Sequence, residues 1–379
     1  MKKKKETGLI DYLKDVPDPR VERTREHQLI DILVIGVCCL ISGGEGFNDM
    51  ESFGKAKYEW FSQFLELPKG IPSHDTFNRV FSAIDPKAFI KCFISWTDTL
   101  RSQFSKEIIA MDRKALRRAG NNDTPMTYIV SAWAAENGLT LGQVKVEDKS
   151  NEITAIPELL NLLDLKGCIV TIDAMGCQKK IAKEIIESDA DYVLALKGNQ
   201  GNAHKEIQDY FDLIVPTPYM EQSTSSDQID FFKTVDNDHG RVETRRYWTS
   251  NDLDWFEDKN KWNGLTCIAM VESVREIGNE YSCERRYFLV SMDCDAKLFA
   301  KACRGHWGVE NPLHWTLDVT FREDNSRART GNAAENLAAL RRLALNMLKK
   351  EPSQKSLSVR GKRLKAGWDN NYLGKVLGI

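Results

Sequence analysis

The sequence predicts a mixed α/β protein that begins with a helical segment. Hydrophobic residues cluster between Leu29 and Leu65 without strand-like alternation, whereas short apolar runs alternate with amphipathic stretches after residue 105. Two of those apolar runs end at an aspartate. With 379 residues, 42% of them hydrophobic and 28% charged, the chain is long enough to form two or three domains with hydrophobic cores.

Composition argues against a membrane, secreted or zinc-ribbon protein. The longest apolar stretch, Leu29–Ile41, is too short to span a bilayer and contains Asp31, which favours a buried helix. No signal-peptide cleavage site follows it, despite the basic residues Lys2 to Lys5. The nine cysteines form no C-x-x-C pair, so we expect reduced, mostly buried thiols in a cytoplasmic protein with no membrane partner.

The formal net charge of −2 means that any nucleic-acid site must be a local basic patch. Candidate patches are Arg113-Lys114 with Arg117-Arg118, Arg241 with Arg245-Arg246, and the segment Lys355 to Lys365 in a basic C-terminal tail over residues 351–379. Each of them is equally compatible with an ordinary solvated surface.

Residues 1–100 form a predicted helical N-terminal domain that would associate with DNA. Within it, Ser73 precedes an apolar-periodic run at Phe77, Val80, Phe81 and Ile84, which is typical of a capped helix. This helix could be the reading helix of a helix-turn-helix or an ordinary packed helix, and the sequence leaves both interpretations open.

The next part of the chain has an informative order of elements. Strands are predicted at Ile108–Met111, Tyr128–Ala135, Leu139–Val146, Cys168–Ile172 and Tyr192–Leu196, and helices at 151–165 and Gln178–Ser188. The dipeptide Asn137-Gly138 predicts a hairpin between the second and third strands. Three strands followed by helix, strand, helix and strand is the order of the RNase H-like α/β fold.

Asp112 closes the first predicted strand and Asp173 closes the fourth, 61 residues later. These strands are neighbours in an RNase H-like sheet, so the two carboxylates would face each other across a cleft. Two such groups can bring two Mg²⁺ ions together for phosphodiester chemistry, because Mg²⁺ prefers hard oxygen ligands. Taken singly, an aspartate after a strand usually only caps a turn.

Residues 209–293 change character again and predict a β-rich insertion. Its alternating stretches are Phe231–Val235, Tyr247-Trp248, Cys267–Val271 and Tyr287–Val290. A helical end follows from about Lys297 and includes an amphipathic helix with Leu337, Leu340, Ala344, Met347 and Leu348 on one face. We expect the insertion to loop out and return the chain to the cleft.

A third acid, Glu310, lies in the stretch Arg304–Asn311. If that stretch is helical, His306, Glu310 and His314 share one face. The alternative is a packing helix anchored by Trp307 and Trp315. Zinc binding by the two histidines is disfavoured because no cysteine pair or third histidine lies nearby.

At these residues the chain resembles the DDE transposases of insertion sequences, and most closely the H-repeat-associated proteins found with Rhs elements. The landmarks that carry the resemblance are Pro17-Asp18-Pro19-Arg20, Ile71–Phe77, Ile109–Asp112, Thr171–Ala174, Leu196–Gln200, His239-Gly240-Arg241, His306–Asn311 and Leu317–Phe321.

The resemblance implies that Asp112, Asp173 and Glu310 bind Mg²⁺, for which Mn²⁺ would substitute, and are the catalytic residues. It implies a DDE catalytic domain over residues 101–350 that cleaves double-stranded DNA at terminal inverted repeats and joins the ends to target DNA, as a homodimer on DNA. We expect DNA contacts from Lys114, Lys197, Asn199, Arg241, Arg304, His306 and Asn311.

Two departures from the family pattern keep other functions open. Arg113 stands where such proteins usually have glycine, and Pro312 follows Glu310 by two residues. Proline breaks a helix interior but not a first turn. A catalytically silent DNA-binding remnant is therefore an alternative to an active transposase. An RNase H-like nuclease without strand transfer is a further alternative, which would share the three acids but not the N-terminal module or the late insertion.

Overall fold

The computed structural model of the chain describes residues 8–101, 106–120, 125–146, 152–215, 228–238, 241–278 and 280–379. Contacts divide the chain into two compact units. Unit 1 contains residues 1–102, 113–151 and 310–379, and unit 2 contains residues 103–112 and 152–309. The motif residues His239 and Gly240, and the basic residues Lys2 to Lys5, lie outside the described ranges. The three domains with boundaries near residues 100 and 350 remain a prediction.

Unit 2 is built on a mixed sheet whose strands follow the order β1-β4-β5-β9-β8-β7-β6. β1 (Ile108–Leu116), β4 (Ile169–Ile172) and β5 (Asp191–Leu196) run parallel, with Ile108 opposite Ile169 and Met111 opposite Ile172. All four residues of β4 are buried, as expected for a parallel strand covered on both faces.

The predicted β-rich insertion is present, but it does not loop out as a separate body. Four antiparallel strands form it: β6 (Ile229–Asp238), β7 (Arg241–Ser250), β8 (Cys267–Ile277) and β9 (Glu280–Val290). β9 pairs with β5, so these strands extend the same sheet. They are longer than predicted because charged cross-strand pairs, such as Arg246 with Glu272, continue the ladder beyond the apolar residues.

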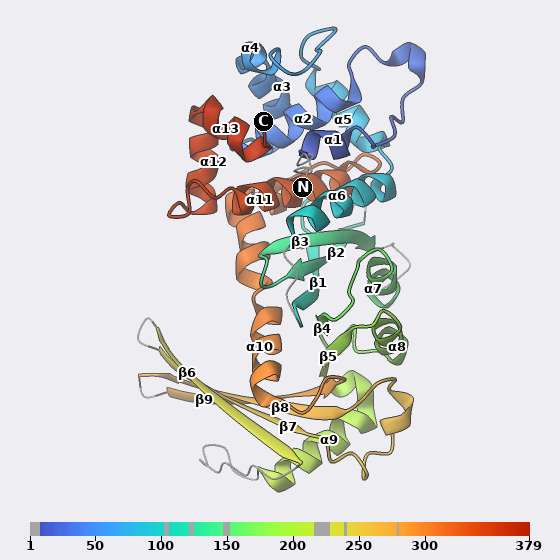
Figure 1. Cartoon of the computed structure of the whole chain (residues 1–379), viewed down its shortest axis with the longest axis vertical. Coiled ribbons are helices and arrows are strands. Elements are labelled where there is room, and N and C mark those ends of the chain that lie inside the picture. The colour runs from blue at the N-terminus through green and yellow to red at the C-terminus, as the bar shows by residue number, and fades with distance from the viewer. Residues whose placement is uncertain are drawn as a thin grey trace, which may run out of the picture. The chain divides into compact units, whose positions relative to one another are not determined.

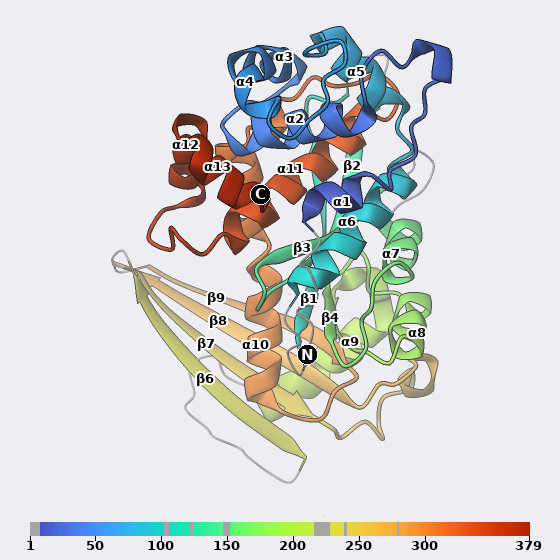
Figure 2. The same ribbon diagram turned by 45° about the horizontal axis from the view of Figure 1, so that its top comes forward.

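Helices cover both faces of this sheet. α7 (Glu152–Leu160) and α8 (Lys179–Glu187) contact each other, and α8 packs on β5. α9 (Gly201–Ile214) and α10 (Ala296–Trp307) lie on opposite faces of the antiparallel strands, as Figures 1 and 2 show. The aromatic contacts agree, because Tyr287 meets Phe211 of α9 whereas the next residue, Phe288, meets Phe299 of α10. Two 3₁₀ turns complete the unit, η2 (Gly198–Gln200) and η3 (Lys259–Lys261).

Unit 1 is mainly helical, and its N-terminal part confirms the predicted helical character. Its first helices are α1 (Leu9–Leu13), α2 (Leu29–Ile41), α3 (Phe47–Ala56), α4 (Tyr58–Phe61), α5 (His74–Ala83) and α6 (Pro86–Leu100), with a 3₁₀ turn η1 (Glu22–Thr24). Ser73 caps α5 as predicted, its hydroxyl accepting from the backbone N–H of Thr76 at 3.3 Å. The buried face of α5 packs against α3 and α11.

The predicted hairpin is confirmed: β2 (Thr127–Ala134) pairs antiparallel with β3 (Leu139–Val146), and Gly138 has a positive φ of 65°. Together with the second half of β1 they give the order β3-β2-β1 within unit 1. The long helix α11 (Ala333–Lys350) packs against α2, α5, α6 and β3. It is not a one-faced amphipathic helix, because fifteen of its residues are buried, including Arg341 and Arg342.

The C-terminal segment is folded and does not form an extended basic tail. It contains α12 (Val359–Trp368) and α13 (Asn370–Leu377), whose apolar residues Ala366, Leu373 and Leu377 are buried. α12 contacts α2, α11 and the π-helix η4 (Glu310–Thr320), which is followed by the 3₁₀ turn η5 (Glu323–Asn325). Among the described residues, no helix has the length and apolarity needed to cross a membrane.

Candidate active site

Asp112 and Asp173 each follow the last paired residue of two neighbouring parallel strands, β1 and β4. Met111 is opposite Ile172 in the β1–β4 register, and each aspartate is the next residue along its strand. The predicted neighbouring positions of the two strands are therefore confirmed, and the aspartates follow paired residues. One detail of the prediction was wrong: β1 does not stop at Asp112 but continues to Leu116, because its second half belongs to the β3-β2-β1 ladder.

The loop after Asp173 is held by hydrogen bonds from its own backbone and from the turn after β5. The Oδ1 atom of Asp173 accepts from the N–H groups of Met175 at 3.1 Å and Gly176 at 3.3 Å. Asn199 donates to the Ala174 carbonyl at 2.7 Å, and Gln200 donates to the Cys177 carbonyl at 2.6 Å. The Asn199 side chain therefore helps to hold the loop that follows Asp173. The sequence predicted a DNA contact for this side chain instead.

Helix α10 approaches the strands that lead to both aspartates. A Cβ atom on Gly305 would lie 2.8 Å from Cγ2 of Ile108, so only glycine permits this packing. The next residue, His306, places Nδ1 3.1 Å from the hydroxyl of Thr171, two residues before Asp173. Burial lowers the pKa of His306, which keeps the ring neutral at pH 7. Sequence reasoning missed Gly305, although a glycine inside a helical pattern signals close packing.

We expect His306→Arg to lower thermal stability and not to raise activity. The larger, permanently charged guanidinium would replace a neutral ring bonded to Thr171 in a largely buried place, with a cost of about 1–3 kcal/mol. This reverses the expectation that arginine, common at this position in related transposases, would be beneficial. Circular dichroism melts of both proteins test it, with His74→Arg at an exposed position as the control. An unchanged melting temperature would contradict the structural role of His306 and leave the residue as a candidate phosphate contact.

The other predicted DNA contacts of unit 2 have different surroundings. Lys197 is exposed, and Arg241 lies 3.5 Å from Glu243. Arg304 is half exposed and donates to Asp236 at 2.7 Å, and Asp236 also accepts from Arg245. Trp307, predicted as a packing anchor, is contacted by the guanidinium groups of Arg245 and Arg286.

Glu310 belongs to unit 1, where it is the first residue of the π-helix, and it is exposed together with Asn311. α10 ends at Trp307, so His306, Glu310 and His314 do not share one continuous α-helical face as predicted. Pro312 stands in the first turn of the new helix, which proline tolerates because its missing N–H would have no partner there.

Lys114 is not available for DNA. Its side chain is 7% exposed, and its ammonium lies 2.6 Å from Asp318, 3.3 Å from Glu323 and 2.9 Å from Asp324. The sequence suggested an exposed patch because Lys114 lies among other basic residues, and the partners that neutralise it are more than 200 residues away. Arg113, the unusual neighbour of Asp112, stacks over the ring of Tyr128 at 4.7 Å.

The residues present suit a hard divalent cation only in part. Asp112 and Asp173 supply the carboxylate oxygens that Mg²⁺ prefers. Within the described ranges, no three histidine, cysteine, aspartate or glutamate residues are gathered closely enough to hold a metal ion. The adjacent aspartates therefore fit two positions of such a site, and a further ligand has to come from elsewhere.

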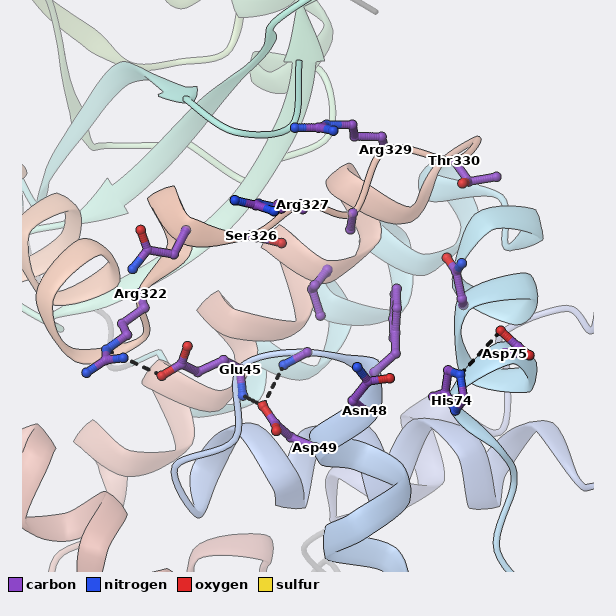
Figure 3. Close-up of a pocket in the computed structure, with 16 residues that line it drawn as sticks. Glu45, Asn48, Asp49, His74, Asp75, Arg322, Ser326, Arg327, Arg329 and Thr330 are labelled. Carbon is purple, nitrogen blue, oxygen red and sulfur yellow. Dashed lines mark hydrogen bonds and ion pairs between the residues drawn. The ribbon is translucent and has the colours of Figure 1, made fainter. Parts of the chain in front are cut away.

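A separate groove of about 470 Å³ lies within unit 1 (Figure 3). The N-terminal ends of α3 and α5 line one side, and the loop Arg322–Thr330 lines the other. Its carboxylates are engaged, since Glu45 pairs with Arg322 at 3.4 Å and Asp49 accepts from the N–H groups that begin α3. Arg327 is exposed on the loop side.

Comparison with known proteins identifies the family. Residues 10–97 match the family described as "DDE_Tnp_1-associated", and residues 103–347 match the "Transposase DDE domain". The chain belongs to the DDE-type transposases of the H-repeat-associated group. "Putative transposase YncI" of Escherichia coli O157:H7 is 43% identical over 98% of this chain and 94% of its own length. "H repeat-associated putative transposase YhhI" of Escherichia coli K12 is 40% identical over 97% of both chains.

Two further similarities are more limited. "Inactive transposase YbfQ" of Escherichia coli K12 is 39% identical over 74 residues, 20% of this chain and 88% of that protein. Among solved structures, the piggyBac transposase synaptic complex with hairpin DNA aligns at a TM-score of 0.46 and 12% identity, covering 97% of this chain and 77% of that one.

Proposed function

We propose that this chain cleaves DNA at the ends of its insertion sequence and transfers the cut strand to target DNA, with Asp112, Asp173 and Glu310 as the metal ligands. The observation that carries the proposal is the β1–β4 register, which sets two aspartates side by side at one edge of a sheet. Bound Mg²⁺ ions would supply an activated attacking oxygen and stabilise the leaving oxygen. The strand order β3-β2-β1-β4-β5 supports the RNase H-like core expected for this chemistry.

Glu310 is proposed as the third ligand because of the path of the chain. His306 is bonded to Thr171, two residues before Asp173, and Glu310 follows His306 by only four residues. Four residues span about 6 Å in a helix and at most about 14 Å when extended. Only four residues of chain therefore separate Glu310 from the histidine that is bonded to Thr171.

Double-stranded DNA is the proposed substrate and a homodimer the proposed assembly on it. The phosphate contacts would come from Lys197, Arg241, Arg304 and Asn311, since Lys114 is neutralised and Asn199 is engaged with Ala174. Because the net charge is only −2, binding must rely on such local cations, and it should weaken steeply with salt. The electrostatic contact with phosphates carries no sequence information, so the terminal repeat must be read by other groups.

The experiment that tests the proposal incubates purified protein and Mg²⁺ with a duplex carrying the DNA ends that flank its gene. Mapped cuts at those ends, followed by joining to a second duplex, support a transposase. Cuts without joining support a nuclease. Binding without cuts supports the silent remnant. The structure accommodates the two sequence departures that favoured the remnant, because Arg113 stacks over the Tyr128 ring and Pro312 lies in the first turn of a helix.

Glu310→Gln should lose Mg²⁺-supported cleavage, whereas Arg304→Ala should mainly weaken DNA binding. Glutamine keeps the size of the side chain but removes the charge that a metal requires, while Arg304 carries one of the exposed cations. Cleavage time courses paired with binding isotherms separate the two effects. Full cleavage by Glu310→Gln would show that Glu310 is not the third ligand. Asp318 and Glu323 would then be the next candidates.

A further inference from the structure

The π-helix that begins at Glu310 is held at three points by basic side chains from three other segments of unit 1. Near its start, Lys349 of α11 donates to the Pro312 carbonyl at 3.1 Å. In its last turn, Asp318 pairs with Lys114 of β1 at 2.6 Å. At its end, the guanidinium of Arg363 from α12 donates to the Thr320 carbonyl and lies 4.2 Å from the ring centroid of Phe321.

The central contact belongs to a buried ionic network. Besides Asp318, the Lys114 ammonium faces Glu323 and Asp324 of η5. Glu323 is fully buried and also accepts from Arg342 at 2.9 Å, and Arg342 donates in turn to the Ser131 hydroxyl at 3.1 Å.

The geometry of the segment explains why such contacts are needed. A π-helix is rare and is usually confined to a single turn, yet here it covers eleven residues. It ends before Arg322, whose φ of 49° lies in the left-handed region that non-glycine residues seldom occupy. A conformation of this kind persists only where the surroundings fix it, and such conformations gather at functional sites.

We propose that Lys114, Lys349 and Arg363 are positioning residues that fix the π-helix and, with it, the place of Glu310 within unit 1. Lys114 is the central one, because it lies two residues after Asp112 on the same strand and therefore on the same strand face. Strand β1 therefore carries both Asp112, a proposed metal ligand, and Lys114, the cation that pairs with Asp318 of the π-helix. This inference rests on the proposed function, which assigns Glu310 to the metal.

Lys349→Met provides the sharpest test, because it removes the hydrogen bond to the π-helix backbone without touching a carboxylate or the buried ionic network. The methionine keeps an apolar side chain beside the Trp133 ring, over which the Lys349 ammonium lies at 4.0 Å. Lys350→Met is its matched control, since the neighbouring Lys350 reaches Asn137 of the β2–β3 turn and not the π-helix. Hydrogen exchange over residues 310–320 reports the order of the segment. Calorimetric titration with Mn²⁺ alone reports the metal site without any cleavage.

We expect Lys349→Met to speed amide exchange in 310–320 by roughly tenfold and to weaken Mn²⁺ binding severalfold, with both quantities unchanged in Lys350→Met. Lys114→Met should produce larger effects if it folds, and Lys114→Arg should restore part of the Mn²⁺ affinity. Unchanged exchange in Lys349→Met would overturn the positioning role. Faster exchange with unaltered Mn²⁺ affinity would show that the Lys349 contact is purely structural. That result would also overturn the positioning role. If the unmodified protein binds no Mn²⁺, the metal site of the proposed function fails, and this inference fails with it.

Discussion

Asp112→Asn and Asp173→Asn are each expected to reduce Mg²⁺-dependent cleavage at least about 1000-fold. A metal ligand contributes several kcal/mol to the stabilisation of developing charge, and each 1.36 kcal/mol is a factor of ten in rate. The fold should survive, because the amide oxygen introduced by Asp173→Asn would still accept from the N–H groups of Met175 and Gly176. Single-turnover cleavage of an end-bearing duplex measures the loss, and circular dichroism checks the fold.

The control for these variants is Asp189→Asn. Asp189 is exposed in the turn between α8 and β5, where it pairs with Lys166 at 3.2 Å. The same change of aspartate to asparagine at this place should leave cleavage within about twofold of the unmodified protein, since exposed ion pairs contribute little. Normal cleavage by either Asp112→Asn or Asp173→Asn would remove that residue from the metal site.

Removal of residues 355–379 is expected to destabilise unit 1 strongly, with a fall in melting temperature of roughly 5 °C or more. Lys362 donates to the carbonyls of Leu348 and Glu351 at the end of α11, and Arg363 donates to the Leu40 carbonyl at the end of α2. Without these donors the buried carbonyls lose their partners, each at a cost of about 1–3 kcal/mol. The apolar residues of α12 and α13 would also leave the core.

The measurement is thermal unfolding of the truncated and full-length chains at the same protein concentration, with a DNA-binding isotherm for each. Lys355→Gln is the matched control, because it removes an exposed charge from the same segment ahead of α12. A truncated protein that melts normally but binds DNA more weakly would contradict the packing role of these helices. It would instead support a DNA-binding function for the basic C-terminal segment.

Local patterns were enough to predict much of the sheet from β1 to β5. The Asn137-Gly138 turn, the apolar run before Asp112 and the run Cys168–Ile172 each follow from short-range rules of turn geometry and burial, and the structure places them as expected. The pairing of the strands that lead to the two aspartates also followed, because the order of strands and helices restricts how parallel strands can be arranged.

Long-range contacts decided the rest. Lys114, Lys362 and Arg363 look like surface cations in the sequence, yet distant carboxylates and helix-end carbonyls make their burial possible. The pairing of β9 with β5 and the change from α10 to a π-helix at Glu310 likewise depend on partners far along the chain. The sequence alone determined the family, the hairpin of β2 and β3, and the neighbouring positions of the strands that lead to Asp112 and Asp173. Only the tertiary structure decided which basic residues are internal, because the partner that neutralises a buried charge is not a local property of the sequence.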